Sequence, residues 1–212
     1  MIPGLKDRLK LYLVAQRGEG GTEPLCERVR EAVRGGVTLV QLRAKTLSAR
    51  DFYHDALALG EMLALRGVPF IVNDRVDLAA LVPGAGVHLG QEDLPVRVAR
   101  KLLGPDRIIG VSAHTPEEAE AAEADGADYI GAGPAFHTTT KRDTGAPQTP
   151  ESLGRIRAAT RLPVVAIGGI HAGNAALLRG LGLAGVAVSS AICGAPDPRE
   201  AAFNVLKAWG EF

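Results

Sequence analysis

The chain has few cysteines, few aromatic residues and no excess of either charge. Cys26 and Cys193 are the two cysteines among 212 residues, and neither belongs to a CxxC spacing. A disulfide framework and a zinc site are therefore not supported, and we expect both thiols to be packing residues. Lysine plus arginine and aspartate plus glutamate number 24 each. Without a summed basic field, nucleic-acid binding is not expected, and any affinity for phosphate has to be local.

Long hydrophobic runs are also missing. The longest apolar segments, such as PFIVN and PVVAIGGI, are far below the ~20 residues of a membrane-spanning helix, and the first four residues begin no signal peptide. We therefore expect no membrane association and a cytoplasmic location. With 46% hydrophobic and 23% charged residues, the composition is that of an ordinary globular protein, and the length predicts a single domain over residues 1–212.

Short apolar runs, rich in β-branched residues, alternate along the chain with stretches rich in alanine, leucine, glutamate and arginine. This alternation is typical of parallel βαβ units. We expect eight strands, at residues 11–15, 37–42, 70–73, 87–89, 108–111, 129–132, 164–167 and 185–188. The third connection, residues 75–84, is the shortest and leaves room for about two helical turns.

The clearest helix start lies at residues 115–118. Thr115 is expected to cap the helix, Pro116 to occupy its first position and Glu118 to complete a capping box.

Eight strand–helix units can form a closed (β/α)8 barrel, known as a TIM barrel, or an open doubly wound sheet. Polar or glycine residues follow nearly every expected strand, in the motifs QLRAK, NDR, GQED, SAH, GPAFHTTTK, GGIH and SSA. A closed barrel brings all of these to one face, at the carboxyl ends of the strands, where active sites of this architecture lie. An open sheet would scatter them, and no GxGxxG follows the first strand. We therefore predict the barrel.

The second strand ends in a group of side chains suited to a diphosphate. Period-two alternation puts Gln41, Arg43 and Lys45 on one side of the extended chain. An amide, a planar guanidinium and a mobile ammonium then meet at the barrel mouth. The alternative is that Arg43 and Lys45 belong to a solvated loop, and the polar residues at the other strand ends favour the functional interpretation.

Carboxylates follow the next two strands. Asn73 and Asp74 end the third run, and Asp93 closes the GQED motif after the fourth. Mg2+ commonly takes one or two protein carboxylates, with substrate phosphates and water completing its shell. Either aspartate could instead cap the helix that follows. Two carboxylates on adjacent strand ends favour a metal site formed by Asp74 and Asp93.

Ser112 and His114 follow the fifth strand, without the GxSxG elbow of a serine hydrolase. Ser112 is interpreted as a hydrogen-bond donor to substrate, and His114 as either a supporting residue or a surface one. The connection at residues 133–149 is long for a barrel. Its hydroxyls and lysine suit a mobile loop that closes over a phosphate, and a plain surface loop is the alternative.

Gly168 and Gly169 follow the seventh strand, and Ser189 and Ser190 follow the eighth. Backbone amides at this place, beside the start of the next helix, form the phosphate site of many barrels. The pattern indicates a phosphomonoester in some substrate.

The motifs resemble the thiamine phosphate synthase family in order and spacing. They are YLV, QLRAK, VND, GVHLGQEDLP, GVSAHT, GADYIGAGPAF, TTTK, VAIGGI and GVAVSSAI, and they cover essentially the whole chain. The resemblance implies a transferase that joins 4-amino-2-methyl-5-(diphosphooxymethyl)pyrimidine to a thiazole phosphate. Thiamine phosphate and diphosphate would be the products, and Mg2+ the cofactor.

The resemblance also implies a role for each matching residue. Gln41, Arg43, Lys45, Asn73, Ser112 and Lys141 would bind the pyrimidine diphosphate, Asp74 and Asp93 would hold Mg2+, and Thr138, Thr140, Gly169, Ser189 and Ser190 would bind the thiazole phosphate. Arg43, Lys45 and Lys141 are the expected catalytic residues, because they would neutralise the departing diphosphate in a dissociative displacement. No protein nucleophile is needed. Association of the chain into a homo-oligomer stays open.

The chain departs from the family pattern at three places. Ala44 stands where an acidic residue is common, Ala15-Gln16 stand where Thr-Asp often ends the first strand, and Thr149 stands where a glycine is usual.

Three other functions fit the sequence less well than the synthase. A thiazole tautomerase, a relative on the same barrel, places a catalytic histidine near Pro134 and lacks the paired aspartates, although His137 lies nearby. A non-catalytic relative would have no physical reason to keep charged groups together. A sugar-phosphate epimerase or aldolase would want a lysine or an acid pair within the strands.

Overall fold

The protein forms a closed barrel of eight parallel strands. The computed structural model describes residues 2–138 and 147–210. Each strand pairs with the next, and β8 returns to pair with β1. The strands are β1 (Leu11–Ala15), β2 (Leu39–Leu42), β3 (Phe70–Asn73), β4 (Gly86–Leu89), β5 (Ile109–Ala113), β6 (Tyr129–Ala132), β7 (Val164–Ile167) and β8 (Gly185–Val188). The predicted (β/α)8 barrel is confirmed, with strand bounds within two residues of those expected at nearly every end.

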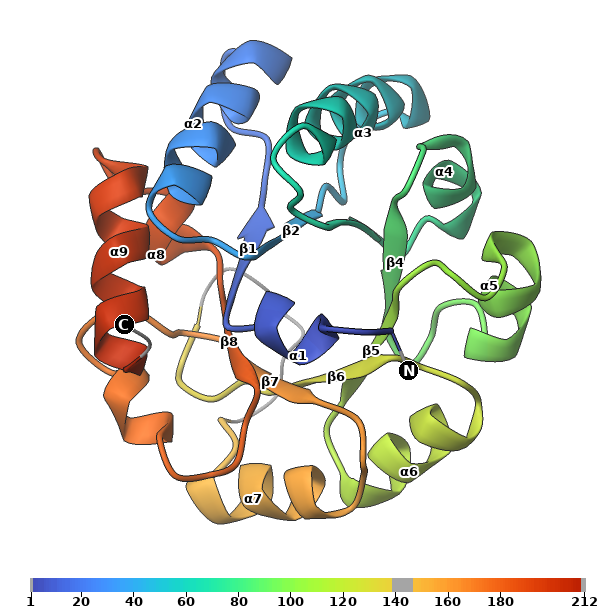
Figure 1. Cartoon of the computed structure of the whole chain (residues 1–212), viewed down its shortest axis with the longest axis vertical. Helices are drawn as coiled ribbons and strands as arrows, with labels where there is room; N and C mark the ends of the chain where they lie inside the picture. The colour runs from blue at the N-terminus through green and yellow to red at the C-terminus, as the bar shows by residue number, and fades with distance from the viewer. Residues whose placement is uncertain (1, 139–146, 211–212) are drawn as a thin grey trace.

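Helices surround the strands (Figure 1). They are α2 (Thr22–Arg34), α3 (Ala49–Ala64), α4 (Val76–Leu81), α5 (Val96–Leu103), α6 (Pro116–Ala124), α7 (Pro150–Ala158), α8 (Ser190–Cys193) and α9 (Pro198–Trp209), with the 3-10 helix η1 (Ala175–Leu178) between β7 and β8. None of the helices in the described ranges has the length and apolar character that crossing a bilayer would require.

The connection between β3 and β4 is the shortest between consecutive strands, as expected, and it holds the six-residue helix α4. The helix between β7 and β8 is only the 3-10 turn η1, because Gly180 and Gly182, both at positive φ, follow it closely and stop any continuation. One local expectation needs correction. Thr115 does cap α6, accepting from the Glu118 N–H. Glu118, however, accepts from the backbone N–H of His114 at 2.6 Å, one residue before the position that a capping box uses. The glutamate thereby ties the end of β5 to α6.

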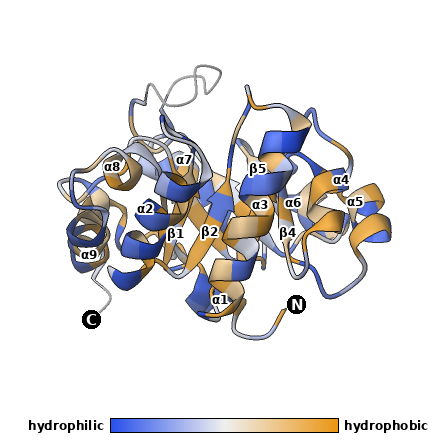
Figure 2. Cartoon of the chain, turned by 90° about the horizontal axis from the view of Figure 1, so that it is seen from above, coloured by the Kyte–Doolittle hydropathy of each residue, from blue (hydrophilic) through white to orange (hydrophobic). Residues whose placement is uncertain are grey.

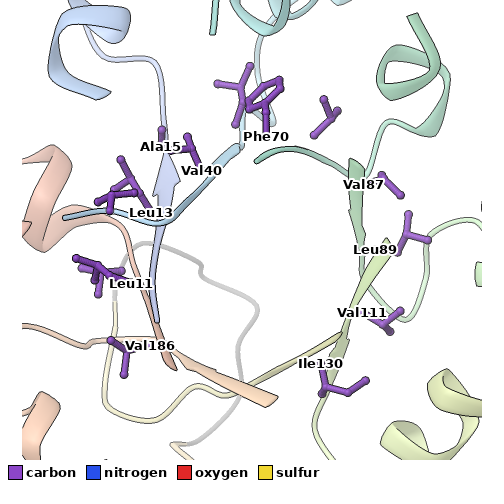
Figure 3. Packing of buried hydrophobic residues seen from close by; sticks show 14 of the residues in the cluster. Leu11, Leu13, Ala15, Val40, Phe70, Val87, Leu89, Val111, Ile130 and Val186 are labelled. Atoms are coloured by element: carbon purple, nitrogen blue, oxygen red, sulfur yellow. The ribbon is translucent and has the colours of Figure 1, made fainter. Parts of the chain in front are cut away.

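The outward side chains of the strands build the larger core. Leu11, Leu13, Val87 and Leu89 belong to it, and Figure 3 shows them pointing away from the ring of strands toward the helices. Hydrophobic segments accordingly concentrate in the strands, whereas the helices present hydrophilic segments outward (Figure 2). A short helix, α1 (Leu5–Arg8), lies across one end of the barrel, where Leu5 joins the inner core cluster and is buried.

The barrel interior is filled by a few large side chains that face glycines on other strands. Tyr12 and Tyr129 lie within it, 2% and 0% exposed. A Cβ at Gly110 would lie 2.0 Å from Cζ of Tyr129, and one at Gly131 would lie 3.1 Å from Cε1 of His88. Gly110 is therefore required by the close approach of the Tyr129 ring, which occupies the place of its missing side chain.

Gly110→Ala is expected to destabilise the protein by at least about 1–3 kcal/mol, the usual cost of overpacking a core. Gly154→Ala is the matched control. Gly154 lies inside α7 with nothing within 4 Å of a Cβ, so alanine should raise stability by about 0.5–1 kcal/mol. Urea unfolding of both variants would measure the two free energies. Equal stability of Gly110→Ala and the wild type would contradict the packing described.

Candidate active site

One cavity opens at the carboxyl ends of the strands. It is lined by eight of the predicted site residues, namely Gln41, Arg43, Asn73, Ser112, Thr138, Gly169, Ser189 and Ser190. These come from strand ends around the whole barrel, so the structure brings together side chains that are far apart in the sequence. Gln41 and Asn73 are buried at the ends of β2 and β3, 4% and 9% exposed, and Arg43 follows β2 with its N–H bonded to the Ala15 carbonyl at 2.9 Å.

Asp74 lies beside this cavity in an unusual backbone conformation. Asp74 has a φ of 61°, and no other non-glycine residue among those described has a positive φ. Such strain in an aspartate is tolerated at low cost and is frequent at functional sites. Burial and the neighbouring Asp93 carboxylate raise the pKa of Asp74 to about 6. Lys45 and Arg43 act in the opposite direction and lower the Asp74 pKa, so both cations lie near this carboxylate.

Asp93 is held by its own turn. Its carboxylate accepts from the Gly90 N–H at 2.6 Å, and it also shares a hydrogen bond with Asp74. Neither aspartate caps the next helix, since the N-cap positions of α4 and α5 are Arg75 and Pro95, without a side-chain cap. The capping alternative is therefore wrong for those helices.

The two carboxylates fit a divalent cation in their chemistry. Two like charges this close oppose each other's ionisation, and a cation between them removes that conflict. Among the described residues no group of three or more histidine, cysteine, aspartate or glutamate side chains could hold a metal. A cation bound here would need further oxygens from water or a ligand, which is how Mg2+ commonly binds next to phosphates.

Ser112 and His114 both line the cavity, from the end of β5. The Ser112 hydroxyl lies 2.9 Å from Nε2 of His88, a residue of β4. His114 is half-buried, and its Nδ1 lies 2.9 Å from the Gly133 carbonyl oxygen. His114 thus belongs to the cavity wall, where it contacts the start of the segment after β6.

The turn after β7 holds that same segment in place. The N–H groups of Ala135 and Phe136 donate to the carbonyls of Ile167 and Gly168, at 2.8 and 3.0 Å. A Cβ at Gly168 would lie 2.6 Å from Cβ of Pro134, and Gly169 has φ 64°. Glycine is thus needed here for packing and for the backbone conformation.

Part of the predicted site lies outside the described residues. Thr140 and Lys141 fall within residues 139–146, as do eight of the 17 residues of the loop expected to be mobile at 133–149. Thr149, one of the departures from the family pattern, is the N-cap of α7, and its hydroxyl accepts from the Ser152 N–H.

The sequence interpretation missed several cavity residues. Tyr12, Gln16, His88 and Pro134 also line the cavity. Tyr12 and His88 were assigned to apolar strand segments without regard to the face on which they lie. The alternation of side chains along a strand could have identified such residues. His88 lies two residues before Gly90, so it points to the same side of the strand and faces inward if the strand end does. Gln16, a departure from the family pattern, has a buried Nε2 that finds no hydrogen-bond partner among the described residues.

Taken together, the barrel and the polar cavity at its carboxyl end define a (β/α)8 enzyme that handles phosphorylated small molecules. The sequence profile described as thiamine monophosphate synthase matches residues 11–192. The thiamine-phosphate synthase of Moorella thermoacetica is 50% identical over 192 residues, which is 91% of either chain. That of Albidiferax ferrireducens is 48% identical over 197 residues, covering 93% of this chain and 90% of the relative.

Solved structures agree with the sequence relatives. The thiamine phosphate pyrophosphorylase from Pyrococcus furiosus superposes with a TM-score of 0.86 at 40% identity, over 98% of both chains. An N-acetylmannosamine-6-phosphate 2-epimerase from Clostridium perfringens reaches 0.67 at 16% identity, which shows a shared fold alone. The chain therefore belongs to the thiamine monophosphate synthase family. It is an enzyme of thiamine biosynthesis, and its reaction is a transfer that forms thiamine phosphate.

The raised pKa of Asp74 predicts a pH-dependent stability of the metal-free protein. A carboxyl whose folded pKa lies above its ordinary value stabilises the fold when protonated, and this contribution is lost as pH rises through about 6. Asp74→Asn removes the charge and tolerates the positive φ. With chelator present, we expect the variant to be more stable than the wild type at pH 8, by a margin that shrinks toward pH 5.

Urea unfolding at both pH values measures that margin. Asp77→Asn is the control of opposite sign, because the Arg75 guanidinium lowers the pKa of Asp77. A loss of stability in metal-free Asp74→Asn at pH 8 would show that the two carboxylates do not oppose each other.

Proposed function

We propose that the residues at the barrel mouth carry out the condensation of an aminopyrimidine diphosphate with a thiazole phosphate by dissociative displacement. One observation carries this assignment. One cavity is lined by Gln41, Arg43 and Asn73 at the ends of β2 and β3 and by a glycine and serine site at the ends of β7 and β8, and Arg43 also lies close to the Asp74 carboxylate. In the closed strand order, β3 lies opposite β7. A substrate with a diphosphate and a substrate with a monophosphate can therefore bind from opposite sides.

The diphosphate belongs on the β2–β4 side in this proposal. Arg43 can form two parallel hydrogen bonds to phosphate oxygens, and Lys45 supplies a second positive charge close to Asp74. Lys141 completes the cationic set as a prediction from the sequence. Asp74 and Asp93 would hold Mg2+, which when bound would neutralise negative charge on the diphosphate.

The reaction breaks the bond between the methylene carbon of the pyrimidine and a diphosphate oxygen. The diphosphate leaves with the bonding electron pair, and the aminopyrimidine delocalises the positive charge that remains. The thiazole nitrogen then forms the new bond to the methylene carbon. Gln41, Asn73 and Ser112, which line the cavity, would orient the pyrimidine during this sequence. No side chain has to form a covalent bond.

The thiazole phosphate belongs at the opposite side of the mouth. Gly169, Ser189 and Ser190 line the cavity there, and Thr138 is brought to the same wall by the hydrogen bonds between the segment after β6 and the turn after β7. Backbone N–H groups and hydroxyls suit a phosphomonoester. Thr140 would add a further hydroxyl. A cytoplasmic location and the possibility of a homo-oligomer belong to the same proposal.

The tautomerase alternative finds little support in the cavity. Pro134, which stands near the position of the catalytic histidine in those relatives, lines the cavity and cannot transfer a proton. His137 has an exposed side chain and lies beside an adjoining hollow together with Thr138 and His171. No lysine or acid pair lies on the inward face of the described strands, as an epimerase or aldolase would require.

The purified protein with Mg2+ should release diphosphate from the pyrimidine diphosphate only when the thiazole phosphate is also present. The charge left on the methylene carbon must be captured for turnover, so neither substrate alone should suffice. A coupled assay for diphosphate measures this, and mass spectrometry identifies thiamine phosphate. Isomerisation of a thiazole carboxylate without any diphosphate release would overturn the proposal in favour of the tautomerase.

Asp93→Ala should raise the Mg2+ concentration needed for half-maximal rate at least tenfold, or abolish turnover, because one of two carboxylates is lost. Asp93→Asn separates this effect from the turn, since an amide oxygen can still accept from the Gly90 N–H. Glu92→Ala, at the exposed neighbouring position, is the matched control and should behave as wild type. Circular dichroism checks the fold. Wild-type rates in both Asp93 variants at limiting Mg2+ would remove Asp93 from the site.

A further inference from the structure

A continuous row of hydrogen bonds crosses the interior of the barrel. Gln41 Nε2 lies 2.6 Å from the Tyr12 hydroxyl, which lies 2.8 Å from the Tyr129 hydroxyl. The Tyr129 hydroxyl lies 2.9 Å from Nδ1 of His88. Nε2 of His88 lies 2.9 Å from the Ser112 hydroxyl. We call these five side chains the interior relay, and its three central members are not among the site residues expected from the sequence.

The two ends of the interior relay lie in the cavity wall, whereas its centre does not. Gln41 and Ser112 both line the cavity, as do Tyr12 and His88. Tyr129 is fully buried and absent from the cavity lining. Its ring packs edge-on against Tyr12, with centroids 5.9 Å apart, and near His88 at 5.5 Å. Tyr129 can therefore act on a substrate only through its neighbours.

Donor and acceptor roles along the relay follow from its Gln41 end. Gln41 Nε2 donates to the Tyr12 oxygen. Either hydroxyl of Tyr12 and Tyr129 can be the donor in the next bond, and donation by Tyr12 is the direction that gives its hydrogen an acceptor inside the barrel. In that direction Tyr129 donates to Nδ1 of His88, which is then the unprotonated ring nitrogen. The imidazole hydrogen is then on Nε2 and is donated to Ser112. The Ser112 hydroxyl hydrogen is left to point into the cavity.

Burial keeps the count of hydrogens intact. Desolvation raises the pKa of both Tyr12 and Tyr129 far above the ordinary value for tyrosine. Each phenol therefore keeps its hydrogen at neutral pH. Inside the barrel, reversing one bond of the relay leaves a hydrogen without an acceptor unless the neighbouring bonds reverse as well.

We propose that Tyr129 is a positioning residue, which fixes the tautomer of His88 and so presents Ser112 to the pyrimidine substrate as a hydrogen-bond donor and Gln41 as an acceptor. This inference rests on the proposed function for the identity of the substrate. The exocyclic amino group of an aminopyrimidine is a donor, so it matches the Gln41 side-chain oxygen. Ser112 then donates to an acceptor of the same substrate, a ring nitrogen or a diphosphate oxygen.

The reverse arrangement would be unfavourable for this substrate. If Ser112 donated to His88, each bond of the relay would run the other way and Tyr12 would donate to the Gln41 oxygen. Gln41 would then turn its amino group toward the amino group of the pyrimidine, and two donors would face each other. Selection between an amino and an oxo group at that ring position would thus be built into the barrel interior.

Nitrogen NMR of protein labelled in the histidine side chains reads the tautomer of His88 directly. We expect a neutral His88 with its hydrogen on Nε2, both in the free enzyme and with the pyrimidine diphosphate bound. His88→Gln identifies the His88 signals among those of the five histidines. A hydrogen on Nδ1, or an imidazolium, in the bound enzyme would overturn the proposal. This reading does not depend on activity, so it separates the relay from the proposed function.

Tyr129→Phe is the decisive variant, because it removes one hydroxyl at constant ring volume and does not touch the cavity. We expect the His88 nitrogen signals to move toward a mixture of tautomers, and kcat to fall about two- to tenfold, the range of one hydrogen bond, with smaller changes in both KM values. Tyr53→Phe, on α3 away from the barrel interior, is the matched control and should change neither.

A purely structural role for Tyr129 would lower stability without altering the tautomer. Unchanged His88 signals in Tyr129→Phe would therefore overturn the proposal, whatever the activity. If that variant does not fold, Tyr12→Phe combined with Ser112→Ala gives a second test. In the relay these two side chains are connected through Tyr129 and His88, so additive effects on kcat would also count against the proposal.

Discussion

The narrow interior of the closed barrel is the constraint on which the rest of the structure depends. Inward side chains from eight strands compete for one space, so a large residue on one strand requires a very small one beside it. Tyr129 opposite Gly110 is the clearest case, since a Cβ would lie 2.0 Å from the ring. The ring then lies where its hydroxyl reaches both Tyr12 and His88. Packing and polar contacts in this interior are thus decided together.

The polar groups in that interior have to be satisfied, because water has no access to the buried hydroxyls. The sequence meets this condition with five side chains that hydrogen-bond in a row and end at the cavity. A hydrophobic filling would serve the fold equally well. The polar one connects the deep packing to the groups that face a ligand, so a substitution at the centre of the barrel can act at its mouth.

Much of the fold could be predicted from the sequence because its signals are local. Apolar runs of four or five residues, separated by amphipathic stretches, gave strand positions close to those observed. The closed form followed from the polar residues after the strands. The missed features depend on details beyond periodicity. The helix between β7 and β8 is a single 3-10 turn because two glycines at positive φ follow it. The sequence alone does not show which glycines adopt a positive φ.

The site residues divide in the same way, into those with a local signal in the sequence and those without one. Residues of the cavity wall that follow the strands, such as Arg43 and Ser189, could be predicted because all strand ends of a barrel meet at one face. Tyr12, His88 and Tyr129 lie within the strands, where apolar character was the criterion and the inward or outward face was not assigned. Gly110 and Gly131 were the available signal, since glycines inside short strands indicate a close approach of another group. Only the register of the strands shows which group approaches.

The aspartate pair shows that this site is not arranged for the stability of the empty protein. Arg43 and Lys45 both favour the charged form of Asp74, yet burial and Asp93 outweigh them, and the Asp74 pKa is raised. A chain selected for stability alone would place a neutral residue here. The raised pKa of Asp74 is what the proposed Mg2+ site would relieve, because a cation beside both carboxylates would favour their charged forms.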